Sequence, residues 1–431
     1  MIDEVPRFPR VRKRILVGIA AIAALAITYG SIPQSIADAY SQSGWEGIYY
    51  RVKDKWPWAS PNIHWESADP DSQGIAAAKL DAIWDQLSEA GTTAFLVVRN
   101  NRIVAEYYGP SKGPNRQSGT SAVGKTITAA MILILAIDDK QIDLDNYVYQ
   151  YVPEWQDIPW KKDITIRQIV THSSGLDNVE FGRSDLSGWK KAYYDSPAER
   201  FRIAIEAAPV LFEPGSQFAY SGLGFYALAY ALGTSLKYSA QPDMKKLLAS
   251  RVMEPLGIPQ HDWSISYGQS NWVDGMRLYS LGSGGSYTPR AIARIGQLLL
   301  NRGQWNGRQL LDAKTVDVMM AYGGLPPEPQ LSPGRHPVSG GIGVWSNCDG
   351  YWSSLPRDAM LGLGGTHSFL LVVPSLDLVV VRMGGRLLKD KKEMAHWQVL
   401  DRIIFTPLSD AIMSPGTAAI AASCAGMRMP R

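Results

Sequence analysis

The sequence has few of the residues that bind metals or form cross-links. Its 431 residues include two cysteines, Cys348 and Cys424, and six histidines. There is no C-x-x-C and no H-E-x-x-H, so the usual zinc-site spacings are missing. The two cysteines could pair in an oxidising compartment. The sequence therefore implies no metal and no organic cofactor.

A strong charge of one sign is also missing. The 43 basic and 40 acidic residues leave a net charge of +3. Much of this excess lies within residues 7–14, so the remainder is close to neutral and gives no support for a nucleic-acid partner. A hydrophobic content of 45% with 19% charged residues indicates a globular chain. Its length predicts one large domain or two intertwined ones.

One long apolar run lies near the N-terminus. Residues 15–32 read ILVGIAAIAALAITYGSI and follow the basic segment 1–14. A basic segment before about 18 apolar residues is typical of an export signal and is long enough to span a bilayer. We favour a signal anchor over a signal peptide cleaved near Ala37-Asp38-Ala39, and both over a buried helix. Residues 1–14 would then be cytoplasmic. The rest would be exported to the periplasm or another extracytoplasmic space, anchored to the inner membrane by residues 15–32.

Periodicity predicts strands near both ends of the chain. Residues 92–109 read as two strands around Asn100-Asn101, and residues 369–385 as two strands around a turn at 374–377. A further strand is expected at 341–347. Helices are expected at 76–90 and 398–405, where apolar residues recur at helical spacing.

The middle of the chain, about 140–330, reads as mostly helical. Strands at both ends with helices between them predict an α+β fold, in which the chain ends build one antiparallel sheet around an inserted helical region. We assign residues 33–75 to a linker, 76–408 to the folded domain and 409–431 to a disordered tail.

Residues 119–126, GTSAVGKT, satisfy the P-loop pattern G-x-x-x-x-G-K-[ST]. A P-loop needs a strand that runs directly into the first glycine. Here about ten polar residues separate the preceding strand from Gly119, and no separate strand ends in an aspartate for magnesium. The pattern therefore does not indicate a nucleotide site.

The same octet is close to a second pattern, S-x-x-K at the start of a buried helix. Residues three apart share a helix face, so the lysine amine can take a proton from the serine hydroxyl. The residue three before Lys125 is Ala122. The serine is one position earlier, at Ser121, and on a helix its side chain would be rotated by about 100° from that of residue 122. Lys125 could also be a helix-start lysine with no chemistry.

The chain resembles the serine β-lactamase family, in its class C, penicillin-binding carboxypeptidase and 6-aminohexanoate-dimer hydrolase branch. The resemblance covers about residues 70–405 through six segments in order. These are residues 120–155 (TSAVGKT…YVPEW), 164–176 (ITIRQIVTHSSGL), 213–232 (EPGSQFAYSGLGFYALAYAL), 251–258 (RVMEPLGI), 282–303 (GSGGSYTPRAIARIGQLLLNRG) and 362–382 (GLGGTHSFLLVVPSLDLVVVR). It implies a β-lactamase/transpeptidase-like fold.

The resemblance also implies roles for individual residues. Lys125 matches the general base of S-x-x-K, and Tyr220 the proton-relay tyrosine of Y-x-N. The third active-site motif falls on Gly364, Gly365, Thr366 and His367. A backbone N–H there, with that of residue 122, would form the oxyanion hole. His367 could stand in for the motif's lysine or histidine, or be an ordinary strand histidine. His172 reads as structural.

Three positions depart from the family pattern. Ala122 occupies the nucleophile position, and Gly222 stands where Y-x-N has an asparagine that contacts the substrate carbonyl. The stretch Leu363–Thr366 is not K-T-G, which puts a carboxylate contact in doubt. The last two departures fit amidases and esterases better than true β-lactamases.

Ala122 leaves three explanations open: a deliberate replacement of serine, a natural pseudoenzyme, or Ser121 acting as nucleophile in a shifted register. The expected function is a serine hydrolase scaffold that cleaves a small or peptide-like amide or ester through an acyl-enzyme, inactivated in this chain. The alternative is a catalytically dead binding protein at the membrane or cell wall.

Overall fold

The computed structural model describes residues 63–110, 112–179, 186–282, 284–321, 325, 340–387 and 396–412. The predicted anchor at 15–32, most of the predicted linker and the chain beyond 412 lie outside these residues. Cys348 is buried, and Cys424 lies outside them too.

A six-stranded antiparallel sheet is built from both ends of the described chain. Its order is β10-β11-β12-β13-β1-β2, so the early strands join the late ones through the β1–β13 pair. The strands are β1 (Thr92–Arg99), β2 (Arg102–Tyr108), β10 (Trp345–Ser346), β11 (Met360–Leu363), β12 (Phe369–Val373) and β13 (Leu378–Gly384). This confirms the predicted α+β architecture.

Both predicted hairpins are confirmed. Asn100 and Asn101 join β1 to β2 with φ angles of 51° and 55°, as a two-residue turn matched to strand twist requires. Between β12 and β13 a 3-10 turn, Pro374–Leu376, leads to Asp377 at φ 46°. The strand expected at 341–347 is shorter than predicted, because only Trp345 and Ser346 pair.

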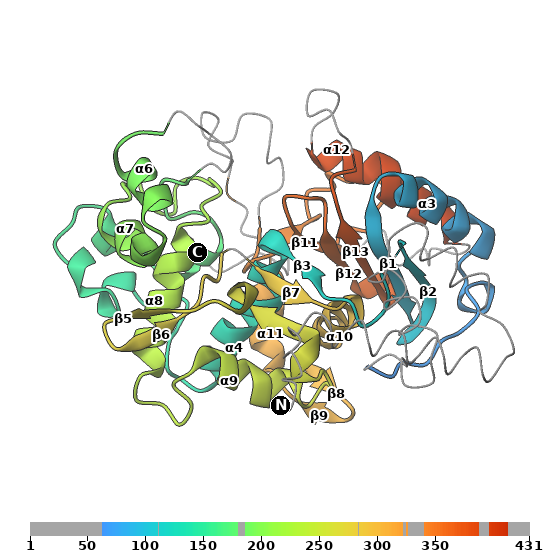
Figure 1. Ribbon diagram of the computed structural model, residues 1–431, viewed down its shortest axis with the longest axis horizontal. Coiled ribbons are helices and arrows are strands. Elements are labelled where there is room, and N and C mark those ends of the chain that lie inside the picture. The colour runs from blue at the N-terminus through green and yellow to red at the C-terminus, as the bar shows by residue number, and fades with distance from the viewer. Residues whose placement is uncertain are drawn as a thin grey trace, which may run out of the picture.

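Helices cover both faces of the sheet (Figure 1). One face packs on α3 (Ala77–Glu89), α12 (His396–Leu400) and α13 (Thr406–Ala411). The other packs on α10 (Pro289–Leu300), where Gly296 has no side chain and an added Cβ would lie 2.7 Å from Leu370 and Val379. Alternate residues of β1, such as Leu96 and Val97, contribute to the two different cores.

The inserted region is mostly helical, as predicted. Its helices are α4 (Met131–Asp138), α5 (Ile166–Val170), α6 (Gly188–Asp195), α7 (Arg200–Glu206), α8 (Gly224–Leu236), α9 (Met244–Leu248) and α11 (Ala313–Met320). It also contains short strands that periodicity did not reveal: β3 (Ser118–Gly119), β4 (Trp263–Ile265), β5 (Asn271–Val273), β6 (Met276–Leu278), β7 (Gly285–Tyr287), β8 (Gln304–Trp305) and β9 (Arg308–Gln309). Two or three residues are too few to show an alternating pattern.

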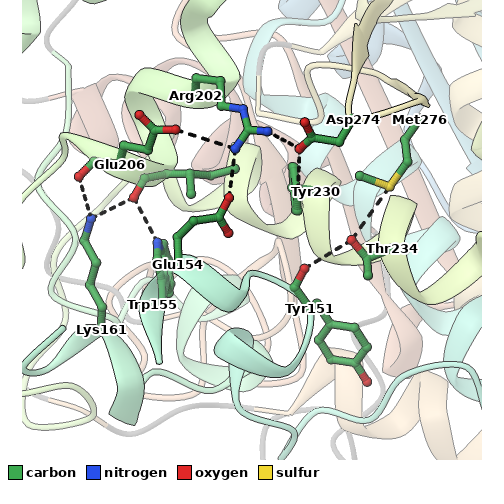
Figure 2. A network of polar contacts seen from close by, with 11 residues as sticks. Tyr151, Glu154, Trp155, Lys161, Arg202, Glu206, Tyr230, Thr234, Asp274 and Met276 are labelled. Carbon is green, nitrogen blue, oxygen red and sulfur yellow. Dashed lines mark hydrogen bonds and ion pairs between the residues drawn. The ribbon is translucent and has the colours of Figure 1, made fainter. Parts of the chain in front are cut away.

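A polar network joins these helices to the loops around them (Figure 2). Arg202 on α7 forms ion pairs with Glu154, Glu206 and Asp274. Lys161 donates from its Nζ to the carbonyl oxygens of Ile205 (2.7 Å) and Glu206 (3.2 Å). The network therefore fixes the C-terminal end of α7 against neighbouring loops.

Within the described residues, one helical run is long and apolar enough to cross a membrane. This run, Ser121–Asp138, is 78% buried, and its apolar residues from Ile127 to Ala136 belong to the main core. It is thus the central helix of the fold, and its N-terminal end carries Lys125.

Candidate functional site

The central helix starts beside Gly284 and strand β11, between the sheet and the helical region (Figure 1). A 3-10 turn, Ser121–Val123, precedes a π-helical turn, Lys125–Ala130. π-Turns of this kind often occur at functional sites. An added Cβ on Gly124 would overlap Gly284, and one on Gly284 would overlap the Ser121 carbonyl oxygen. Glycine is therefore required at both positions for this close approach.

Lys125 is buried, with 3% of its surface exposed. Its Nζ donates to Tyr220 Oη (2.8 Å) and to the carbonyl oxygen of Gly282 (2.7 Å). The Nζ also lies 5.0 Å from the ring centres of Tyr220 and Phe225. The structure thus brings the two predicted proton-transfer residues, which are 95 positions apart, into direct contact.

Aromatic rings hold Tyr220 in place. Its ring centre lies 4.4 Å from that of His172, and Trp345 stacks at 6.2 Å with a 17° angle between the planes. His172 Nδ1 accepts a hydrogen bond from the Ser221 N–H (3.1 Å). These contacts orient the segment that carries Tyr220, in line with the structural role expected for His172.

Ser121 faces the third motif. Its Oγ accepts a hydrogen bond from the Gly365 N–H (3.3 Å), and its own N–H donates to Tyr267 Oη (3.1 Å). Its φ angle is 49°, which is unfavourable for a residue with a side chain. Within the described part of the chain, Lys125 Nζ bonds to Tyr220 and Gly282 and not to Ser121. The structure therefore pairs Lys125 with Tyr220 but does not pair it with Ser121.

The third motif forms a tight turn between β11 and β12. The Gly364 N–H donates to the Ser368 carbonyl oxygen (2.8 Å), and the His367 N–H donates to that of Gly364 (3.0 Å). An added Cβ on Gly364 would lie 3.1 Å from Ser121 Cβ. The turn therefore lies directly against the residue that precedes Ala122, with Gly365 exposed.

His367 is 4% exposed and has a φ angle of 60°. Its Nδ1 accepts a hydrogen bond from the Leu387 N–H (3.2 Å), a backbone group beyond β13. This contact favours the structural alternative for His367 over a substrate contact.

Arg382 on β13 supports the same turn, and sequence reasoning did not identify it. It is fully buried, and it donates to Thr92 Oγ1 (3.1 Å) and to the carbonyl oxygens of Thr366 (3.0 Å) and Gly385 (2.8 Å). Burial lowers the pKa of this guanidinium to about 9. In the sequence, Arg382 is visible only as one arginine in an apolar strand. That pattern does not indicate which groups the guanidinium would bind.

Two other residues at the site carried no sequence signal. Tyr267 lies beside Ser121, and burial raises the pKa of its phenol, so it keeps its proton at neutral pH. Asn178 accepts a hydrogen bond from the Gly222 N–H (2.9 Å) through its Oδ1. Both come from loops that are distant from the helix start in sequence.

The geometry suits proton transfer without a metal ion as reactant. A lysine amine bonded to a tyrosine hydroxyl can relay a proton to and from a group placed beside it. Position 122 is three residues before Lys125 and next to the Ser121–Gly365 contact. Among the described residues, no cluster of three His, Cys, Asp or Glu side chains could bind a metal.

Comparison with known proteins places this arrangement in context. The model of the family described as Beta-lactamase matches residues 80–401. The 6-aminohexanoate-dimer hydrolase of Paenarthrobacter ureafaciens is 24% identical over 350 residues, which cover 78% of this chain and 82% of that protein. The D-alanyl-D-alanine-carboxypeptidase/endopeptidase AmpH of Escherichia coli K12 is 25% identical over 233 residues. That match covers 50% of this chain and 58% of AmpH.

Solved structures show the same fold. A family VIII carboxylesterase superposes with a TM-score of 0.55 at 18% identity, covering 78% of this chain and 99% of that chain. The similarity thus extends from the sheet through the helical region.

Proposed function

The chain belongs to the beta-lactamase family of hydrolases, and from this premise we propose that its site binds an amide or ester and lacks only the nucleophile needed to cleave it. Ala122 occupies the nucleophile position. The chain as it stands would bind such a compound without forming an acyl-enzyme. Serine at position 122 would restore hydrolysis.

The observation that carries this proposal is the 2.8 Å hydrogen bond between Lys125 Nζ and Tyr220 Oη. A buried lysine without a carboxylate partner is costly unless its donors are bonded. Here Tyr220 and the Gly282 carbonyl oxygen bond them, so the amine and the hydroxyl stay together at the helix start. This is the geometry that a general base and its relay need.

Restored chemistry would proceed in two steps. Lys125 and Tyr220 would take the proton from the new serine hydroxyl as its oxygen bonds to the substrate carbonyl carbon. The carbonyl oxygen would become an oxyanion held by the N–H groups of residue 122 and of the third-motif turn. As the carbon–nitrogen or carbon–oxygen bond breaks, the relayed proton passes to the departing amine or alcohol. In the second step water attacks the acyl-enzyme carbonyl carbon and gives up its proton by the same relay. The bond to the serine oxygen breaks, the serine regains a proton, and the acid product leaves.

The substrate class is proposed from the relatives and from the third motif. One relative is a 6-aminohexanoate-dimer hydrolase, another is a D-alanyl-D-alanine-carboxypeptidase/endopeptidase, and a structural neighbour is a family VIII carboxylesterase. The turn Gly364–His367 offers backbone groups and a buried histidine, with no lysine for a carboxylate. We therefore propose uncharged amides and esters over β-lactams.

Export to the periplasm with a membrane anchor is proposed on the sequence of residues 1–32 alone. A reporter fused after residue 60 would test it: periplasmic alkaline phosphatase activity in the membrane fraction is expected. A fusion protein that is made but has no phosphatase activity would contradict export, because the disulfide bonds of the reporter do not form in the cytoplasm. Activity in the soluble periplasmic fraction would contradict the anchor.

A second candidate function is a binding protein that has lost catalysis, and Ala122 itself favours it. The two proposals differ in what one substitution does. If the remainder of the site is intact, Ala122→Ser alone makes an enzyme. If the site has changed further for binding, it does not.

The test is labelling by a fluorescent fluorophosphonate, with turnover of p-nitrophenyl acetate and nitrocefin alongside. The variants are the unchanged chain, Ser121→Ala, Ala122→Ser, and Ala122→Ser combined with Lys125→Met or Tyr220→Phe. We expect label and ester turnover only with Ala122→Ser, and a loss of about 10²-fold or more with either second change. Labelling of the unchanged chain that Ser121→Ala abolishes would make Ser121 the nucleophile. An inert Ala122→Ser would favour the binding protein.

A further inference from the structure

The segment that carries Tyr220 lies beside the loop 177–178. Ser221 Oγ donates to the carbonyl oxygen of Asp177 (3.3 Å), and the Gly222 N–H donates to Asn178 Oδ1 (2.9 Å). The loop is itself anchored, because Leu176 pairs with Val210 and Asp177 forms an ion pair with Lys190. Asn178 is thus a positioned side chain on a supported loop.

The Asn178 side chain lies next to the point where a side chain at position 222 would begin. An added Cβ on Gly222 would lie 3.4 Å from Asn178 Oδ1, with no other described atom outside its immediate neighbours within 4 Å. Asn178 is therefore the described side chain that a residue at position 222 would contact first. The missing side chain at Gly222 leaves its backbone N–H open to the Asn178 amide, which binds it.

The hydrogen bond also fixes which way the amide faces. A backbone N–H can only donate, so the Gly222 N–H selects the oxygen of the Asn178 amide. The Nδ2 group is on the opposite branch and has no hydrogen-bond partner within the described part of the chain. Asn178 is partly exposed, so a ligand can approach this residue.

Backbone contacts connect Gly222, the residue bonded to Asn178, with the residue bonded to Lys125. An added Cβ on Gly282 would lie 2.7 Å from the Gly222 carbonyl oxygen, so these two backbones touch. The carbonyl oxygen of Gly282 in turn accepts from Lys125 Nζ. Gly222, which is bonded to Asn178, therefore contacts Gly282, which is bonded to Lys125.

We propose that Asn178 supplies, from another loop, the amide donor that the Tyr220 segment lacks at Gly222, and that its Nδ2 contacts the carbonyl oxygen of the substrate's acyl portion. This inference rests on the proposed function. It makes Asn178 a specificity-determining residue that binds amides and esters whose acyl group bears an acceptor near the scissile bond. Substrates without that acceptor gain nothing from it.

The variants separate this role from a structural one. Asn178→Asp keeps an oxygen for the Gly222 N–H and loses the Nδ2 donors, whereas Asn178→Ala loses both. Gly222→Asn paired with Asn178→Gly moves the amide from the loop 177–178 to the segment that carries Tyr220. All are made in Ala122→Ser, and thermal melting confirms folding.

The probes are the p-nitroanilides of acetyl-glycine and of pentanoic acid, which have acyl chains of equal length, and only the first has an acyl-side amide. We expect Asn178→Asp and Asn178→Ala to lower kcat/KM for the first about tenfold or more, with little effect on the second. The paired exchange should recover most of the loss.

Two outcomes overturn the inference in distinguishable ways. Asn178 is structural if Ala122→Ser turns over both probes and the Asn178 variants match it. Asn178 is also structural if Asn178→Asp retains the preference for the acetyl-glycine probe and Asn178→Ala loses it. In either case the proposed function stands. If Ala122→Ser neither labels nor turns over any probe, the proposed function fails and this inference fails with it.

Discussion

Lys161 should make the stability of the protein rise with pH in a range where most proteins lose stability. It is 4% exposed, and its Nζ bonds to the last two carbonyl oxygens of α7 (Figure 2). Burial lowers its pKa from 10.5 to about 8, opposed in part by the Glu206 carboxylate. The ordinary value applies once the chain unfolds.

The sign follows from proton counts. Between pH 8 and 10.5 the unfolded chain still holds the proton on Lys161, whereas the folded protein has released it. Stability therefore increases with pH across that window. Up to pH 9.5 the gain is about 2 kcal/mol, at about 1.4 kcal/mol for each pH unit above the folded pKa.

The comparison is between the unchanged chain and Lys161→Met, unfolded in urea at pH 7 and pH 9.5. At pH 7 the variant loses two hydrogen bonds but also a buried charge, so we expect a small deficit of about 1 kcal/mol. At pH 9.5 the deficit should grow to about 3 kcal/mol, because the unchanged chain then holds an uncharged amine. Lys162→Met, at the exposed neighbour, should show no pH-dependent difference. A deficit for Lys161→Met that is constant across this range would refute the reasoning.

Three further predictions concern the helix start and the turn beside it. Ser121→Gly, made in Ala122→Ser, relieves the unfavourable φ angle and frees the Gly365 N–H. Fluorophosphonate labelling should then be about three- to tenfold faster. Slower labelling would show that the Ser121 hydroxyl assists the reaction. Gly284→Ala should lower the unfolding free energy by about 3 kcal/mol or more through overlap with the Ser121 carbonyl oxygen. Gly275→Ala, also at positive φ but in open space, should cost only about 1 kcal/mol in the same urea titration. Arg382→Lys keeps a charge but cannot reach three separate acceptors, so calorimetry should show a loss of about 2 kcal/mol.

The sheet was predictable from sequence because its strands are long and its turns have a chemical signature. Asn100-Asn101 tolerates the left-handed backbone that a two-residue hairpin needs, and the apolar runs around 374–377 have the length of buried strands. The strands at 263–265 and 285–287 gave no such signal. They pair where the backbone of Gly285 lies against the carbonyl oxygen of Ser264, which is a tertiary contact.

The site was predictable only where a motif carries its own spacing. Lys125 and Tyr220 could be named because each sits in a recognisable short pattern, and the structure brings them together. Asn178 and Tyr267 could not, because each reaches the site from a loop whose sequence has no periodicity. The resemblance implies that an amide is missing at Gly222, and only the tertiary structure places the Asn178 amide beside that residue.

Lys125 also has a structural task that does not depend on catalysis. It joins the central helix to Tyr220 and to the loop at Gly282, and its hydrogen bonds there offset the cost of burying an amine. A chain without a nucleophile at position 122 would therefore keep this lysine for stability alone. The structure places Lys125 and Tyr220 in contact, and the reactivity of Ala122→Ser tests whether that contact serves hydrolysis. Lys125→Met should lower the unfolding free energy of the unchanged chain, and an unchanged urea midpoint would mean that the lysine is held there for chemistry only.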